Sequence, residues 1–137
     1  MSRTRDMFVA EALNEAIWIR DNADTIDKET LIDAVKDLAK YKLFSSRQMS
    51  AITNGRLSHT TISRMINKHD RTGGNLNVGT LDILRSILYN RANGSTSYNL
   101  IHDAVGSGTS QGMVSKITGV SQSAISKNIK EIDNESR

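Results

Sequence analysis

Residues 111–130, QGMVSKITGVSQSAISKNIK, carry the pattern that decides the fold of this chain. The stretch predicts a first short helix over residues 111–118, followed by a turn at Gly119. Glycine adopts the left-handed turn conformation without the steric cost that a Cβ imposes. Ser121 can then cap a second helix, because a serine hydroxyl accepts hydrogen bonds from the first free backbone N–H groups. Two short helices joined by such a turn form a helix-turn-helix.

The spacing of apolar residues predicts which face the second helix exposes. Three apolar side chains are expected to point inward and to fix the angle between the helices: Val114, Val120 and Ile125. The side chains expected on the outward face are polar: Gln122, Ser123, Ser126 and Lys127. An amide can pair bidentately with adenine, a hydroxyl can donate or accept, and an ammonium group can reach guanine or phosphate. The outward face is therefore suited to reading DNA bases.

This segment resembles the helix-turn-helix of lambdoid phage repressors of the Cro/CI type. The residues that carry the resemblance are Gln122, Ser123, Ala124 and Ile125, followed by Lys127 and Ile129. The resemblance covers residues 111–130 only, and it implies that Gln122, Ser123 and Lys127 contact bases or neighbouring phosphates. Ser115 stands where a closely packed Ala is usual, and Thr118 stands where an apolar residue is usual. An ordinary helical hairpin with a glycine at its turn is the alternative.

A second copy of the same plan lies upstream, in residues 45–67. Ser45 and Gln48 have the spacing of a capping box, which marks the start of a helix. Ala51 is expected at the close contact between the helices, Gly55 in the turn and Ile62 inside the fold. The turn carries one extra residue, Arg56.

The second helix of this upstream motif is expected to start at a Ser58 cap and to return to the core at Met65 and Ile66. Asn77 can cap a further helix, in which apolar residues recur every three or four positions: Leu81, Leu84, Ile87 and Leu88. The order of helix-turn-helix, loop and packing helix resembles the repressor-type domains of phage and bacterial regulators. Two plain core helices joined by a polar loop are the alternative.

The sequence thus predicts DNA contacts from both motifs. The candidate DNA-binding residues of the upstream motif are Arg56, Ser58, His59, Thr60, Thr61, Arg64 and Lys68. Those of the downstream motif are Ser121, Gln122, Ser123, Ser126, Lys127 and Lys130.

The N-terminal third is expected to be a scaffold of two amphipathic helices. Over residues 5–22 the apolar side chains form one stripe, from Phe8 to Ile17, and Trp18 widens it. A second stripe, from Leu31 to Ala39, follows a cap at Asp27. These stripes could pack on the upstream helix-turn-helix or on a second subunit, and packing within the chain is favoured.

The predicted fold is therefore all-α, a helical bundle with two helix-turn-helix units joined by a short linker. Residues 1–92 are expected to form a repressor-like domain, and the polar, glycine-bearing residues 93–97 are expected to form the linker. Residues 98–137 would form a second, small unit. A unit of that size rarely folds unaided, so we expect it to draw stability from the first domain, a partner subunit or DNA.

Basic charge coincides with both motifs. Residues 1–42 contain seven Lys or Arg and nine Asp or Glu, whereas residues 43–92 contain seven and two. Within residues 111–130 there are three lysines and no acidic residue. Positive charge on the reading helices is what the neutralisation of phosphates requires.

Composition excludes several other classes. The chain has no Cys and its three His residues lack metal-ligand spacing, so neither a metal site nor a cofactor is expected. No apolar run is long enough for a membrane span and the N-terminus lacks a signal-peptide pattern, so a cytoplasmic protein is expected. Recombinases and transposases also carry helix-turn-helix segments, but no clustered Tyr, Arg and His residues or spaced carboxylates support catalysis.

The expected function is sequence-specific binding of a double-stranded DNA operator, with repression of transcription by occlusion of RNA polymerase. Repression is implied by the resemblance to phage immunity repressors. Two unlike reading helices in one chain predict a monomer on an asymmetric site, with a homodimer as the alternative. A protein-binding regulator, such as an antirepressor, an antitoxin or a recombination accessory factor, is the alternative function.

Overall fold

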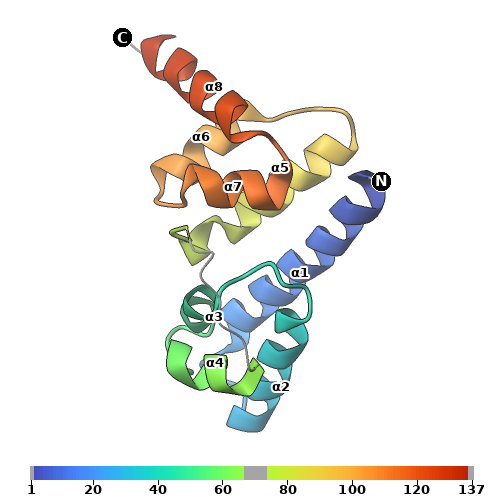
Figure 1. Cartoon of the computed structure of the whole chain (residues 1–137), viewed down its shortest axis with the longest axis vertical. Coiled ribbons are helices and arrows are strands. Elements are labelled where there is room, and N and C mark those ends of the chain that lie inside the picture. Colours follow the sequence, from blue (N-terminus) through green and yellow to red (C-terminus); the bar gives the residue numbers. More distant parts are fainter. Residues whose placement is uncertain (1, 67–73, 136–137) are drawn as a thin grey trace. The chain divides into compact units, whose positions relative to one another are not determined.

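The computed structural model describes residues 2–66 and 74–135, and all regular structure within these residues is helical (Figure 1). The expected all-α class is confirmed. The helices are α1 (Ser2–Asn22), α2 (Lys28–Ala39), α3 (Ser46–Ile52), α4 (His59–Ile66), α5 (Leu81–Ala92), α6 (Tyr98–Gly106), α7 (Gln111–Thr118) and α8 (Gln122–Glu135). A short 3₁₀ turn, η1 (Val78–Thr80), precedes α5.

The chain divides into two compact units, and the boundary differs from the expected one. The N-terminal unit comprises residues 7–73, and the C-terminal unit comprises residues 1–6 and 74–137. Helix α5, which the sequence assigned to the first domain, packs against α6 and α7 in the C-terminal unit. Residues 93–97 are a connection inside that unit, where the Asn90 side chain donates to the Ser97 hydroxyl at 2.7 Å. The expected linker is therefore corrected to an internal loop.

The apolar stripe of α5 explains this division. Leu81, Leu84, Ile87 and Leu88 are all buried, as the three-to-four-residue spacing predicted. Helices α6, α7 and α8 supply five large buried apolar side chains, Ile101, Met113, Val114, Ile117 and Ile125, and α5 adds four more. By taking in α5, the C-terminal unit gains a core that residues 98–137 alone could not form.

The N-terminal unit is a four-helix arrangement of α1, α2, α3 and α4. Figure 1 shows α3 and α4 as neighbouring short helices, and both α3 and α2 contact α4. Asp27 caps α2 as expected, accepting the Thr30 N–H and the Thr30 hydroxyl. The expected packing of the amphipathic helices within the chain is confirmed, because the buried faces of α1 and α2 belong to this unit.

Two aromatic residues depart from the expected stripe of α1. Phe8 and Trp18 are 48% and 45% exposed, whereas Val9, Leu13 and Ile17 on the same helix are buried. The buried arc of α1 is thus narrower than its apolar arc. The two rings form part of the surface instead of the core.

A buried pair of threonines joins η1 to the loop before α7. The Asn77 N–H donates to Thr109 Oγ1 at 3.0 Å, and Thr80 and Thr109 hydroxyls lie 2.7 Å apart. Thr80 gives its own hydrogen to the Asn77 carbonyl at 2.7 Å, so Thr109 must be the donor between the two hydroxyls. This network links two segments about thirty residues apart.

Replacing Thr109 by Val should destabilise the C-terminal unit by about 1–3 kcal/mol, because the buried Thr80 hydroxyl and the part-buried Asn77 N–H each lose a partner while the side-chain shape is kept. Native-state hydrogen exchange of the α5 and α7 amides measures this unit separately. Thr96→Val, on an exposed loop residue of the same unit, is the control and should change stability by less than about 0.5 kcal/mol. Equal protection in the two variants would contradict the assigned role.

Candidate nucleic-acid interface

The downstream helix-turn-helix consists of α7, a turn at Gly119 and α8. Ser110 caps α7 by accepting the Met113 N–H at 3.2 Å. Gly119 has φ +80°, the left-handed conformation that its sequence position predicted, and its N–H donates to the Ser115 carbonyl at 2.9 Å. The Arg91 guanidinium on α5 donates to the Thr118 carbonyl at 2.5 Å. The last carbonyls of α7 are therefore paired both locally and from α5.

Thr118, the polar residue at a position that is usually apolar, fits the motif through its hydrogen bonds. It is fully buried, and its hydroxyl donates to the Val114 carbonyl at 2.7 Å. The same hydroxyl accepts the Val120 N–H at 3.3 Å. Both polar capacities are used, so the buried hydroxyl stabilises the turn and leaves no unpaired group.

Helix α8 starts as the sequence predicted. Ser121 Oγ accepts the Ala124 N–H at 3.2 Å, and the Ser121 carbonyl accepts the Ile125 N–H at 3.0 Å. The three side chains expected to fix the helix angle, Val114, Val120 and Ile125, are all buried. These contacts orient the first turns of α8 against α7.

The predicted reading residues of α8 lie together on its surface. Ser121, Gln122, Ser123, Lys127 and Lys130 are exposed, and Ser126 is half-buried. Ile125 is the buried residue of α8, and Ser123, Lys127 and Lys130 lie on the side of the helix away from it, whereas Ser121 and Gln122 are exposed at its N-terminal end. The surface carries amide, hydroxyl and ammonium groups with no acidic residue before Glu131.

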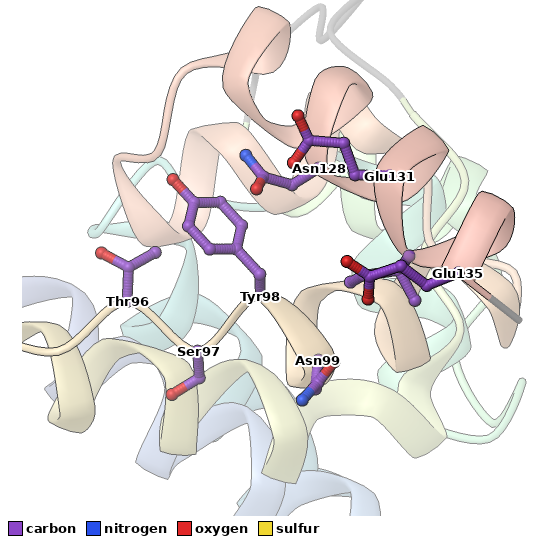
Figure 2. A pocket seen from close by; sticks show the side chains of 8 residues that line it. Thr96, Ser97, Tyr98, Asn99, Asn128, Glu131 and Glu135 are labelled. Carbon is purple, nitrogen blue, oxygen red and sulfur yellow. The ribbon is translucent and has the colours of Figure 1, made fainter.

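The C-terminal end of α8 carries acidic side chains instead of basic ones. A surface hollow of about 460 Å³ lies between α8 and the start of α6, and Figure 2 shows Tyr98 facing Asn128 and Glu131 across it. Glu135 also lines the hollow. Near this end, His102 on α6 pairs with Asp133 at 2.7 Å. Acidic side chains repel phosphates, so the surface suited to DNA is confined to the first part of α8.

The upstream helix-turn-helix consists of α3, a longer turn and α4. Ser45 and Gln48 form the predicted capping box, with the Ser45 N–H donating to Gln48 Oε1 at 2.8 Å and the Gln48 N–H to Ser45 Oγ at 3.1 Å. The turn contains Asn54 and Gly55 with φ of +57° and +80°. Ile62 of α4 is fully buried, as expected.

Ala51 does not make the close helix contact that the sequence predicted, because it is exposed on α3. The neighbouring Ser50 holds the turn instead, and its hydroxyl donates to the Leu57 carbonyl at 2.7 Å. The contact with the chain after the turn is thus made one position before the predicted one.

The predicted reading residues of α4 are also at the surface. Ser58, Thr60, Thr61 and Arg64 are exposed, and His59 is half-buried. Ser58 caps the helix by accepting the Thr61 N–H at 3.1 Å, and its hydroxyl lies 2.9 Å from Thr61 Oγ1. Lys68 lies outside the described residues.

Arg56 has a structural partner that the sequence did not reveal. Its guanidinium donates to the carbonyls of Ala23 and Ile26, the latter at 2.6 Å. The Asn54 side chain likewise donates to the Arg20 carbonyl at 3.1 Å. These bonds attach the turn of the upstream motif to the end of α1 and the loop that follows. Contact between Arg56 and DNA stays a prediction.

The first helix of each motif adds an exposed cation that the sequence reasoning did not include among the candidates. Arg47 is exposed on α3, and Lys116 is exposed on α7. In helix-turn-helix proteins the first helix crosses the DNA backbone. Position on that helix was the signal that could have added these two residues.

Other kinds of site have less support. Across residues 2–66 and 74–135, no group of three or more His, Asp or Glu side chains could hold a metal ion. Among the same residues, no helix has the length and apolar character needed to cross a membrane. Comparison of the chain with protein-family models, curated proteins and solved structures finds no match.

Replacing Gly119 by Ala should destabilise the C-terminal unit by about 1–2 kcal/mol, because an L-residue is strained in the left-handed conformation. The added Cβ would also lie 2.6 Å from Arg91 Nη1, so the bond from Arg91 to Thr118 would shift. Thermal unfolding and amide exchange of α7 measure the loss.

The control is Gly106→Ala in α6, where a Cβ meets no atom within 4 Å. This substitution should be neutral or stabilising by up to about 1 kcal/mol. Equal effects of the two substitutions would show that the Gly119 turn is not required.

Proposed function

We propose that this chain is a sequence-specific double-stranded DNA-binding protein that represses transcription, reading the major groove with α8 and α4. The observation that carries the proposal is the exposed polar and basic surface at the start of α8. There Ser123 and Lys127 lie on the side of the helix opposite the buried Ile125, and Gln122 is exposed at the first residue of the helix. A helix so presented can enter the major groove with its N-terminal residues at base edges.

The upstream motif supports the proposal independently. Thr60 and Arg64 are exposed on α4, which is fixed by a buried Ile62 in the same manner. Arg64 is the strongest candidate there for guanine or phosphate contact, because its guanidinium can pair bidentately with either. We assign repression to occlusion of RNA polymerase on the bound operator, in the cytoplasm where that DNA is accessible.

Replacing Gln122 by Ala should weaken operator binding by about 1–3 kcal/mol and relax the preference at one base pair, because a base-reading amide is lost. Replacing Lys130 by Ala should weaken binding to all sequences alike and reduce the salt slope by about 1, because a phosphate contact is lost. Fluorescence anisotropy titrations on operator and scrambled DNA at several salt concentrations measure both effects.

Two exposed residues serve as controls, Asn134 at the acidic end of α8 and Lys36 on α2. Asn134→Ala and Lys36→Ala should leave affinity within about twofold, a change of about 0.4 kcal/mol. Identical behaviour of the Gln122 and Lys130 variants would contradict their separate roles. Undetectable binding to any DNA, at low salt as well, would favour the protein-binding alternative.

Two unlike reading helices in one chain further suggest that a monomer reads an asymmetric site. Selection of bound sequences from a random pool should then return a site without inverted symmetry. Sedimentation of the complex should give one chain per site. A clean inverted repeat bound by two chains would replace this assignment with a homodimer.

A further inference from the structure

The N-terminal unit carries a groove between α1 and α2 that is lined mainly by aromatic and acidic side chains, together with Lys40. It consists of two adjoining hollows of about 360 and 210 Å³ that share Glu15 and Asp37. We name it the α1–α2 groove and define it by seven residues: Phe8, Glu11, Glu15, Trp18, Asp37, Lys40 and Tyr41. None of the predicted DNA-reading residues lines it.

The aromatic residues of the groove are held at the surface. The rings of Phe8 and Tyr41 are in contact, with centroids 4.8 Å apart and planes tilted by 58°. Phe8 and Trp18 are each nearly half exposed, although most large apolar side chains of this unit are buried. Exposed aromatic rings attract cations to their faces and are frequent anchors of protein interfaces.

The charges of the groove carboxylates are only weakly neutralised by a neighbouring cation. The Lys40 ammonium lies 3.3 Å from Asp37, but both side chains are more than half exposed, so the pair contributes little. Glu15 Oε2 is buried and has no hydrogen-bond partner among the described residues. Burial raises the pKa of Glu15 above its ordinary value; a hydrogen bond with Tyr41 and the charge of Lys40 oppose the rise, and Asp37 and Glu11 add to it. A cation placed there would satisfy an oxygen that the chain leaves unpaired.

We propose that the α1–α2 groove binds arginine side chains displayed by a basic segment of a partner protein. Guanidinium groups fit best, because they stack on aromatic rings and pair with carboxylates through several N–H donors at once. Phe8, Glu11, Glu15 and Trp18 follow one another along α1 over about 15 Å, at 1.5 Å per residue. The groove therefore has room for arginines one or two helical turns apart on the partner.

Charge argues against the other occupants. In a symmetric contact between two copies of the chain, the same carboxylates would face one another. Nucleic acid and anionic lipid would be repelled by Glu11, Glu15 and Asp37. The charge of the groove is complementary to a basic polypeptide, and this proposal stands independently of the proposed operator binding.

Trp18 gives a local readout, because it is the only tryptophan in the sequence. The probe is a blocked, alanine-based peptide with arginine at every fourth position, titrated against the full chain. We expect a saturable change in Trp18 fluorescence. The same peptide with glutamate in place of arginine should produce none, and the lysine version should bind more weakly than the arginine version.

The variants separate the groove from overall charge. The double substitution Glu15→Gln with Asp37→Asn should weaken peptide binding by about tenfold, or about 1.4 kcal/mol. Glu29→Gln with Asp33→Asn removes the same charge from exposed positions of α2 outside the groove and should change affinity by less than about twofold. Equal weakening by the two pairs would overturn the proposal.

Three further measurements test the proposal if the double variant does not fold, if the chain self-associates or if DNA binding changes. If the Glu15 substitution disturbs folding by circular dichroism, Asp37→Asn alone, on a side chain that is 60% exposed, should still weaken binding. Self-association in sedimentation equilibrium that Phe8→Ala abolishes would assign the groove to a second copy and overturn the proposal. Operator affinity measured on both double variants should be equal, so failure of either function is recognised separately.

Discussion

The left-handed turn at Gly119 is the constraint on which the downstream interface depends. With φ fixed at +80°, the chain reverses within a few residues, so Val120 and Ile125 reach the same core as Val114. The surface position of Lys127 then follows from helical periodicity, because Ile125 is buried on the other side of α8, and Gln122 is exposed at the N-terminal end of the helix. Arg91 reinforces the turn from α5 through the Thr118 carbonyl. The turn at Gly119 therefore determines both the packing of the C-terminal core and the exposure of the proposed DNA-binding side chains of α8.

The features that sequence reasoning predicted are those determined by local rules. The bounds of α7, the cap at Ser121 and the capping box of Ser45 and Gln48 each depend on residues within a few positions of one another. The predicted boundary between the units was wrong. Whether α5 packs against the helices before it or after it depends on long-range contacts, and the periodicity of its apolar residues does not show which. The prediction that Phe8 and Trp18 belong to the buried stripe of α1 was wrong for a related reason. The apolar residues of a helix show which side is buried, but they do not show how wide the surface is that packs against it. The bonds from Arg56 to Ala23 and Ile26 join residues about thirty positions apart, and no local pattern indicates them.

The two motifs reach similar geometry by different means. The downstream turn is short and is held by a buried threonine hydroxyl at Thr118. The upstream turn has an additional residue and two positive φ angles, and it is held from outside by Arg56 and Asn54 on the carbonyls near the end of α1. The downstream turn also receives a bond from outside the motif, from Arg91 of α5 to the Thr118 carbonyl. The exposed side chains of the second helices also differ, with Gln122 and Lys127 on α8 and Thr60 and Arg64 on α4.

The distribution of charge within the N-terminal unit has its own physical consequence. An acidic α1–α2 groove on the same compact unit as α4 opposes the approach of phosphates, and screening reduces that repulsion beyond about 10 Å at 0.1 M salt. A unit that only bound DNA would gain affinity from neutral residues at Glu11, Glu15 and Asp37. The groove also keeps Phe8 and Trp18 in water and leaves a carboxylate oxygen of Glu15 unpaired, so it lowers the stability of the isolated chain. A groove that is unfavourable both for folding and for DNA affinity is best explained by a partner that covers it. A basic segment would cover the aromatic rings, pair with the Glu15 oxygen and neutralise the charge that repels phosphates.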